Sequence, residues 1–150
     1  IFKMLNMKKI RFLQFEKHQL FSNPLDWGSL VLRVIPSFYM FNYHGFKKIS
    51  GTGSWEWLGE AALSLIGIEI GFMFFGFLAA FSEGVLSWFV IFGIFTRLSS
   101  IFLMITMFFA SVFHLVKGDT AELAIIYFTI YLVLFILGPG QYSIDKKYLN

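Results

Sequence analysis

Ionisable side chains that interrupt apolar stretches are the residues most able to do chemistry in this chain. Glu83 lies near the middle of the apolar stretch 71–95, and Arg33 lies inside the stretch 27–44. An ionisable group in hydrocarbon costs several kcal/mol on insertion scales, so it calls for a partner or a function. We therefore predict that Glu83 faces protein and pairs with Arg33, whose long side chain can reach toward the middle of the apolar layer.

Small residues beside Glu83 indicate which face of its helix packs against protein. Gly76, Ala80 and Gly84 recur at a spacing of four, with Glu83 and Ser87 next to them. Such a stripe lets a second helix approach closely. The pattern predicts that Glu83 points into a helix bundle.

Two histidines extend the set of candidate site residues. His44 lies eleven residues after Arg33, which is nearly three helical turns, so the two share one helix face. His114 ends a third apolar stretch at a similar depth. Together Arg33, His44, Glu83 and His114 are predicted to bind a small head group, such as a quinone ring, between helices.

Two alternatives to that site stay open. The Arg33–Glu83 pair can instead be a buried ion pair that only fixes helix register. His44 and His114 could also hold a haem between them, but two histidines at matched depth are a weak motif, so we treat haem as the lesser alternative. No third ligand stands at a spacing that suits a metal ion, and none is expected.

A second pair of charges falls at helix ends. Arg97 and Asp145 each lie where an apolar stretch meets a polar one. We predict a structural salt bridge between them that closes one end of the bundle. The alternative is two solvated charges, because exposed pairs contribute little.

Composition limits the classes of function. The chain has 150 residues, of which 57% are hydrophobic and 14% charged, and its mean hydropathy is +0.72. A soluble domain is about 25% charged, so a soluble enzyme, a nucleic-acid binder and a disordered chain are all disfavoured. Zero Cys excludes disulfides, thiol catalysis and Cys-ligated clusters.

The order of apolar stretches predicts an all-α integral membrane four-helix bundle. The expected spans are 27–44, 71–95, 98–115 and 123–137. An additional interfacial or re-entrant helix is expected at 55–70, between spans one and two, because its three glutamates make it too charged to span. The predicted domain organisation is an N-terminal cytoplasmic or interfacial segment at 1–26, a bundle at 27–140 and a short cytoplasmic tail at 141–150.

Turns and charges predict the topology. Only Thr96 and Arg97 separate the second and third spans, so these spans should form an antiparallel hairpin. Gly138-Pro139-Gly140 should end the fourth helix. The positive-inside rule places both termini in the cytoplasm. The basic residues expected on that side are Lys3, Lys8, Lys9, Arg11, Lys17, Arg97, Lys146 and Lys147.

Four short motifs, in order along the chain, resemble the DoxX family. They are Leu32-Arg33 with His44-Gly45-Phe46-Lys47-Lys48, Ser82-Glu83-Gly84 with Gly93-Ile94-Phe95-Thr96-Arg97-Leu98, Thr106-Met107 with Ala110 and His114, and Gly138-Pro139-Gly140-Gln141-Tyr142-Ser143-Ile144-Asp145. The resemblance covers about residues 28–145. Ser37 and Ser87 stand where the family usually has glycine, and Pro36 is a further departure.

The resemblance implies a small four-helix protein of the bacterial inner membrane. The family takes its name from a subunit linked to quinone-dependent sulfur oxidation, and relatives are associated with membrane oxidoreductase complexes. We therefore expect a subunit or partner of a quinone-linked redox complex, not catalytic alone, that contacts lipid and other membrane subunits and no nucleic acid. The alternatives are a purely structural or assembly subunit and a small-solute or proton carrier.

Overall fold

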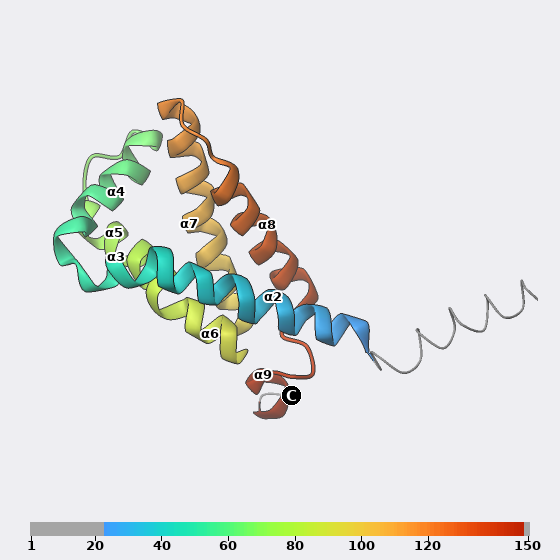
Figure 1. The fold of residues 1–150 in the computed structure, drawn as a ribbon. Coiled ribbons are helices and arrows are strands. Elements are labelled where there is room, and N and C mark those ends of the chain that lie inside the picture. The colour runs from blue at the N-terminus through green and yellow to red at the C-terminus, as the bar shows by residue number, and fades with distance from the viewer. Residues whose placement is uncertain (1–22, 149–150) are drawn as a thin grey trace, which may run out of the picture.

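The computed structural model describes residues 23–148, and this part of the chain is all-helical, without a strand. The first 22 residues lie outside it, so most of the predicted N-terminal segment is not described. Figure 1 shows α2 crossing α6, α7 and α8, with α4 and α5 beside it and α9 at the C-terminal end. The elements are α2 (Pro24–Met40), η1 (Phe41–Gly45), α3 (Phe46–Ser50), η2 (Thr52–Ser54), α4 (Trp55–Leu63), η3 (Ser64–Ile66), α5 (Phe72–Phe81), η4 (Ser82–Leu86), α6 (Ser87–Phe92), α7 (Thr96–Lys117), α8 (Glu122–Leu137) and α9 (Ile144–Tyr148).

The first helix is longer than the sequence pattern predicts. The chain stays helical from Pro24 to Ser50, because the π-helical turn η1 joins α2 to α3 without a break. The loop expected from Gly45 onward therefore begins only at Gly51. At 1.5 Å per residue this helix is about 40 Å long, more than the hydrocarbon thickness of a bilayer.

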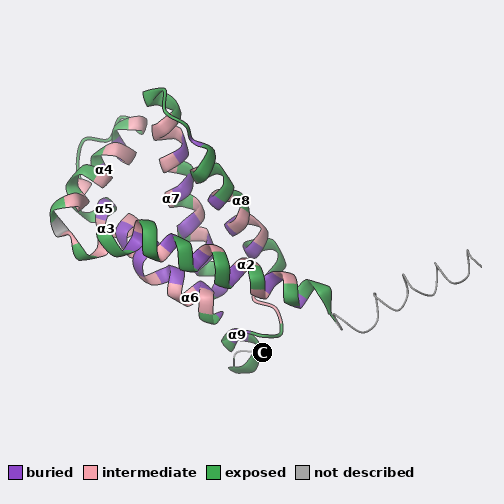
Figure 2. Cartoon of the chain, in the orientation of Figure 1, coloured by how far each residue is buried: buried purple, intermediate pink, exposed green. Residues whose placement is uncertain are grey.

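Polar residues face inward and apolar residues outward along α2. Its buried residues are Asp26, Ser29, Arg33, Ser37 and Met40. Figure 2 shows these buried positions alternating with exposed ones along the ribbon. The exposed ones include Leu25, Val31, Val34, Ile35, Phe38 and Tyr39. A helix with this distribution is suited to an apolar solvent, because water would favour the reverse.

The charged stretch after the first helix forms a short helix that packs along α5. Residues 55–70 contain α4 and the single turn η3, and the helix ends at Gly67, which has a φ of 73°. The axes of α4 and α5 come close at two glycines. A Cβ on Gly76 would overlap the carbonyl group of Trp55, and one on Gly59 would overlap that of Phe72. Small residues thus allow this hairpin, as the Gly76 stripe predicts.

Within residues 23–148, two helices are long and apolar enough to cross a membrane. The first runs from Phe72 to Phe92 through α5, η4 and α6, and the second is α7. Their bounds lie within a few residues of the predicted spans. Helix α8 is apolar but shorter, and it ends before Gly138 as expected.

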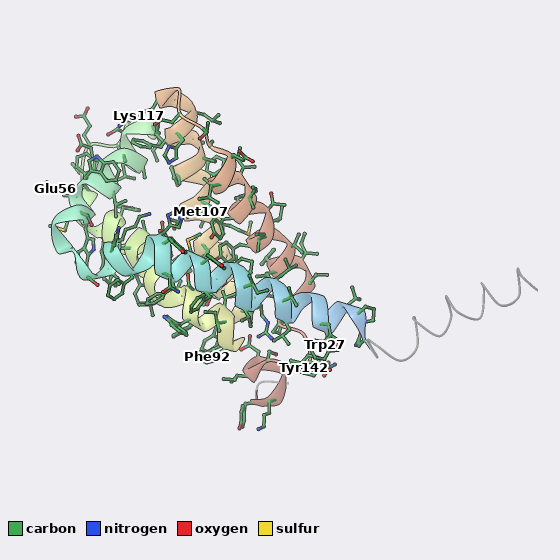
Figure 3. The ribbon with its side chains drawn as sticks, in the orientation of Figure 1. Trp27, Glu56, Phe92, Met107, Lys117 and Tyr142 are labelled. Atoms are coloured by element: carbon green, nitrogen blue, oxygen red, sulfur yellow. The ribbon has the colours of Figure 1, made fainter. Side chains whose placement is uncertain are left out.

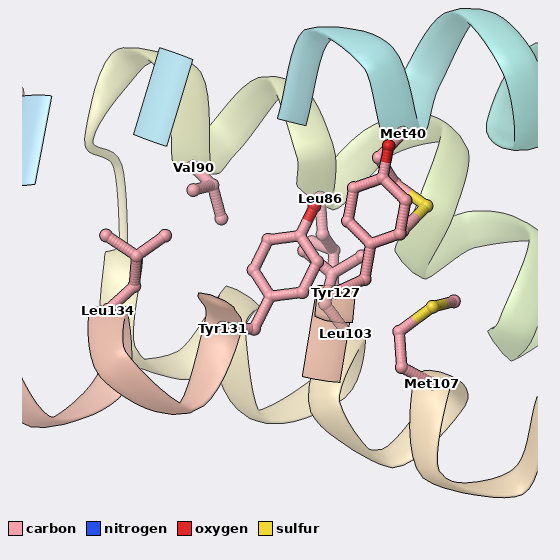
Figure 4. Packing of buried hydrophobic residues seen from close by; sticks show 8 residues of the cluster. All are labelled: Met40, Leu86, Val90, Leu103, Met107, Tyr127, Tyr131 and Leu134. Atoms are coloured by element: carbon pink, nitrogen blue, oxygen red, sulfur yellow. The ribbon is translucent and has the colours of Figure 1, made fainter. Parts of the chain in front are cut away.

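The apolar core lies where α2, α6, α7 and α8 meet. Figure 4 shows Tyr127 and Tyr131 rising from α8 into this core, with their hydroxyl groups turned away from their own helix. Tyr131 has no exposed surface. The cluster consists of Met40, Leu86, Val90, Leu103, Met107, Tyr127, Tyr131 and Leu134.

Residues after α8 fold back onto the bundle. The segment from Gly138 leads into α9, and Ser143 and Asp145 are buried. The expected short tail therefore packs against the bundle through Ser143 and Asp145, and its other described residues are exposed. It lies at the same end as the start of α2 and the turn before α7 (Figure 1), as the predicted topology requires.

Candidate functional site

Glu83 is the most buried acidic residue in the described part of the chain, and its partner is a lysine. The Lys48 ammonium donates hydrogen bonds to both carboxylate oxygens of Glu83, each 2.7 Å away. The side chain of Glu83 is 1% exposed, whereas that of Lys48 is 28% exposed. Charge-assisted bonds to both oxygens neutralise a carboxylate that would otherwise be costly to bury.

Two π-helical turns bring this pair together. Glu83 is in η4, and Lys48 follows η1 by one turn of α3. A Cβ on Gly45 would overlap the backbone of Glu83, so a glycine is needed for this approach. Gly84 lies in the same way against Ile49. A π turn inserts one extra residue into a helix and is frequent at functional sites.

The predicted Arg33–Glu83 pair is not formed, because each residue has another partner. Arg33 lies fifteen residues before Lys48 on the same helix, roughly 22 Å along its axis. Lys48 was missed because Gly45 was interpreted as the end of the first span. The sequence does hold a signal for Lys48. If the helix continues past Gly45, Lys48 lies on the same helix as Arg33 and His44.

Polar and aromatic side chains from α2, η1, α6 and α8 lie near the contact between η1 and η4. The ring of His44 lies edge-on to Tyr127, with centroids 6.0 Å apart. Tyr131 donates to the hydroxyl of Ser37 over 3.4 Å. Ser87 donates to the Glu83 carbonyl over 2.7 Å. Of the four predicted site residues, the structure thus gathers His44 and Glu83.

Arg33 belongs to a different site, at the C-terminal end of the molecule. Its side chain is fully buried and donates through Nη2 to the Tyr142 carbonyl over 2.7 Å. Its Nε and Nη1 have no hydrogen-bond partner. Two further residues of the same face hold the returning chain, since Ser29 donates to the Gly138 carbonyl and Asp26 accepts from the Gln141 amide. We call Asp26, Ser29, Arg33 and Asp145 with their backbone partners the C-terminal clasp.

Asp145 completes the clasp at the start of α7. One carboxylate oxygen accepts from the Phe95 amide over 2.7 Å, and the other accepts from the amide and hydroxyl of Thr96 over 2.8 and 3.0 Å. A carboxylate at a helix N-terminus satisfies amides that lack partners within the helix. The predicted Arg97–Asp145 salt bridge is therefore replaced by these bonds. The Arg97 guanidinium lies instead beside Gly138, 3.3 Å from where a Cβ would stand.

His114 lies apart from the other site residues. It is in the last turn of α7, with Phe113 and Asp119 as its neighbours. Its Nδ1 is 3.7 Å from the Asp119 carboxylate. No group of three metal-ligating side chains occurs within residues 23–148. The structure thus records no contact between His114 and the Lys48–Glu83 pair.

Comparison with known proteins gives one match. The family model named DoxX matches residues 28–115, which include the first helix, the Lys48–Glu83 pair and most of α7. No curated protein sequence matches the chain. No solved structure matches it either. The matched region covers more than half of the chain, and we conclude that this protein belongs to the DoxX family of membrane proteins.

Proposed function

We propose that this DoxX protein is an accessory subunit of a quinone-linked redox complex in the bacterial inner membrane. In this proposal the long first helix, the Phe72–Phe92 helix, α7 and α8 all cross the bilayer, with both termini in the cytoplasm. The subunit is not catalytic alone. Its role is to contact a quinone ring at the Lys48–Glu83 pair and to bind neighbouring subunits through its lipid-exposed faces.

The inward-facing polar residues of α2 support the membrane part of the proposal. In water, exposing the apolar face of α2 would be unfavourable, and so would burying its polar residues Arg33 and Ser37. In lipid, the same distribution is favourable. The exposed apolar residues of α7 and α8, such as Ile105 and Ile136, extend that surface.

The quinone part of the proposal rests on the third N–H donor of the Lys48 ammonium, which Glu83 does not take. An ammonium group has three N–H donors, and Glu83 takes two of those of Lys48. The third is free to donate to a ligand carbonyl, since part of the Lys48 side chain is exposed. His44 offers a second donor, and the edge of Tyr127 an aromatic wall. A quinone has two carbonyl acceptors and a flat ring, which fit this set.

Quinone retention by matched histidine variants tests this proposal. The purified full chain is titrated with a short-chain quinone in detergent, and bound quinone is measured by native mass spectrometry. We expect His44→Gln to weaken binding about tenfold, the effect of one hydrogen bond, with thermal unfolding unchanged. His114→Gln is the control and should bind as the unaltered protein does. Equal binding by both variants, or none above partition into micelles, would contradict the proposal.

A purely structural role is the second candidate, and one observation favours it. Glu83 has both oxygens bonded, and η4 packs closely against η1 at Gly45 and against α3 at Ile49. In this second candidate the sole role of the ion pair is to fix this crossing. This role predicts no quinone retention in the same titration. It also predicts that Lys48→Met abolishes co-purification of a partner subunit that the His44→Gln variant still retains.

A further inference from the structure

A hollow of about 590 Å³ opens between the end of α6 and the returning C-terminal chain. Figure 3 labels Phe92 and Tyr142 at this end of the molecule. One wall is apolar and comes from α6, and the other carries amide, hydroxyl and ammonium groups. The lining residues that matter here are Ile91, Phe92, Gln141, Ser143, Lys146 and Lys147. The volume is in the range of ordinary ligand sites.

The two lysines of this hollow make no ion pair with a described residue. The ion pairs found between residues 23 and 148 are Lys48–Glu83 and His114–Asp119, so neither Lys146 nor Lys147 has an acidic partner in this part of the chain. Asp145 precedes them in the sequence, and its two oxygens are bonded to the start of α7. The described lining of the hollow therefore contains two lysines and no acidic side chain.

The position of the hollow matches the level of lipid head groups. Phe92 is the last residue of a helix long enough to cross a membrane, and it is 52% exposed. Tyr142 and Ile144 are also exposed on the returning chain. Aromatic residues beside lysines are typical of the boundary between hydrocarbon and water.

We propose that this hollow binds the head group of an anionic phospholipid. Lys146 and Lys147 bind the phosphate, Gln141 donates to its oxygens, and the upper part of an acyl chain lies along Ile91 and Phe92. The lysines then favour binding of an anion, and the apolar wall favours a lipid over a free ion. The site is independent of the proposed quinone contact, which lies at the Lys48–Glu83 pair.

Lipid retention measured by native mass spectrometry tests the site. The full chain in detergent is titrated with phosphatidylglycerol or with phosphatidylcholine that has the same acyl chains. We expect one phosphatidylglycerol to be retained in preference to phosphatidylcholine. The double variant K146Q/K147Q should weaken its binding by about tenfold or more. The control K117Q removes an exposed lysine from the far end of α7 and should change nothing.

A second variant separates a defined site from general attraction by charge. Ile91→Trp fills the hollow and leaves both lysines in place, so it should also abolish preferential retention. Retention that survives this variant, or that is equal for both lipids, would overturn the proposal. Inorganic phosphate is the last arm, and it should not displace the lipid at millimolar concentration. If it does, the site takes a free anion and the lipid assignment is wrong.

Discussion

Charge is buried in two regions of this molecule, in two different ways. At the Lys48–Glu83 crossing, one side chain neutralises another across two helices. In the C-terminal clasp, Arg33 and Asp145 are bonded mainly to backbone groups, the Tyr142 carbonyl and the amides of Phe95 and Thr96. The first arrangement joins neighbouring helices, and the second holds the segment after α8 against α2 and the start of α7.

The difference indicates which residues can be replaced without loss of the fold. A fully buried carboxylate whose only charged partner is removed keeps the whole desolvation cost. A group bonded to backbone can be replaced by a smaller cap or by water at lower cost. The crossing should therefore be more sensitive to loss of one partner than the clasp is.

Lys48→Met should have the largest effect. It leaves Glu83 buried without its counter-charge, which costs about 3–5 kcal/mol when a buried pair is broken from one side. Thermal unfolding in detergent, followed by circular dichroism, checks the loss. Lys47→Met, a change at the adjacent lysine, is the control, and the comparison of the two regions fails if both variants unfold alike.

Asp145→Ala should come next. It removes the acceptor for the amides of Phe95 and Thr96, and Phe95 has an unfavourable φ of 45° that these bonds help to hold. We expect a loss of about 2 kcal/mol, as for a charged cap. Hydrogen exchange should show faster exchange at the start of α7 and unchanged exchange at η4. Unaltered exchange at Thr96 would contradict the assignment.

Arg33→Met should destabilise the protein less than Lys48→Met does. Arg33 makes one hydrogen bond to the chain, and two of its buried nitrogens, Nε and Nη1, have no partner, so its removal relieves part of its own desolvation cost. We expect about 1 kcal/mol in the same thermal assay. A loss as large as that of Lys48→Met would show that Arg33 has a stronger partner than Tyr142.

Ser29→Ala should have the smallest effect. It deletes a single neutral hydrogen bond, to the Gly138 carbonyl over 3.0 Å, worth about 1 kcal/mol or less. Limited proteolysis of the C-terminal segment is the sensitive readout, because that segment loses one of its contacts with α2. Ser50→Ala, which removes a bond within α3 only, is the control and should leave proteolysis unchanged.

The sequence was sufficient for the family and for the positions of three apolar helices. Apolar stretches located Phe72–Phe92, α7 and α8, and the Gly76 stripe was correctly interpreted as a close helix contact. These features depend on local composition and spacing, which a sequence displays directly. The grouping of the start of α2, the turn at Thr96 and the segment after α8 at one end also follows from counting spans.

Partner choice for the buried charges could not be obtained in the same way. The π turn η1 carries the first helix past Gly45, and the π turn η4 lies within the Phe72–Phe92 helix at Glu83. A pattern based on 3.6 residues per turn does not contain such insertions, so it ends the first span before Lys48 and pairs Arg33 with Glu83. The bonds of Asp145 were missed because they go to backbone amides, which carry no residue type to identify them.

Double-mutant cycles on Glu83 test the central claim most directly. The claim is that Lys48, and not Arg33, is the partner of Glu83 inside the bundle. Unfolding free energies are measured for Glu83→Gln combined with Lys48→Met, and for Glu83→Gln combined with Arg33→Met. We predict a coupling of about 2 kcal/mol or more in the first cycle and close to zero in the second. A second cycle as strongly coupled as the first would contradict this account.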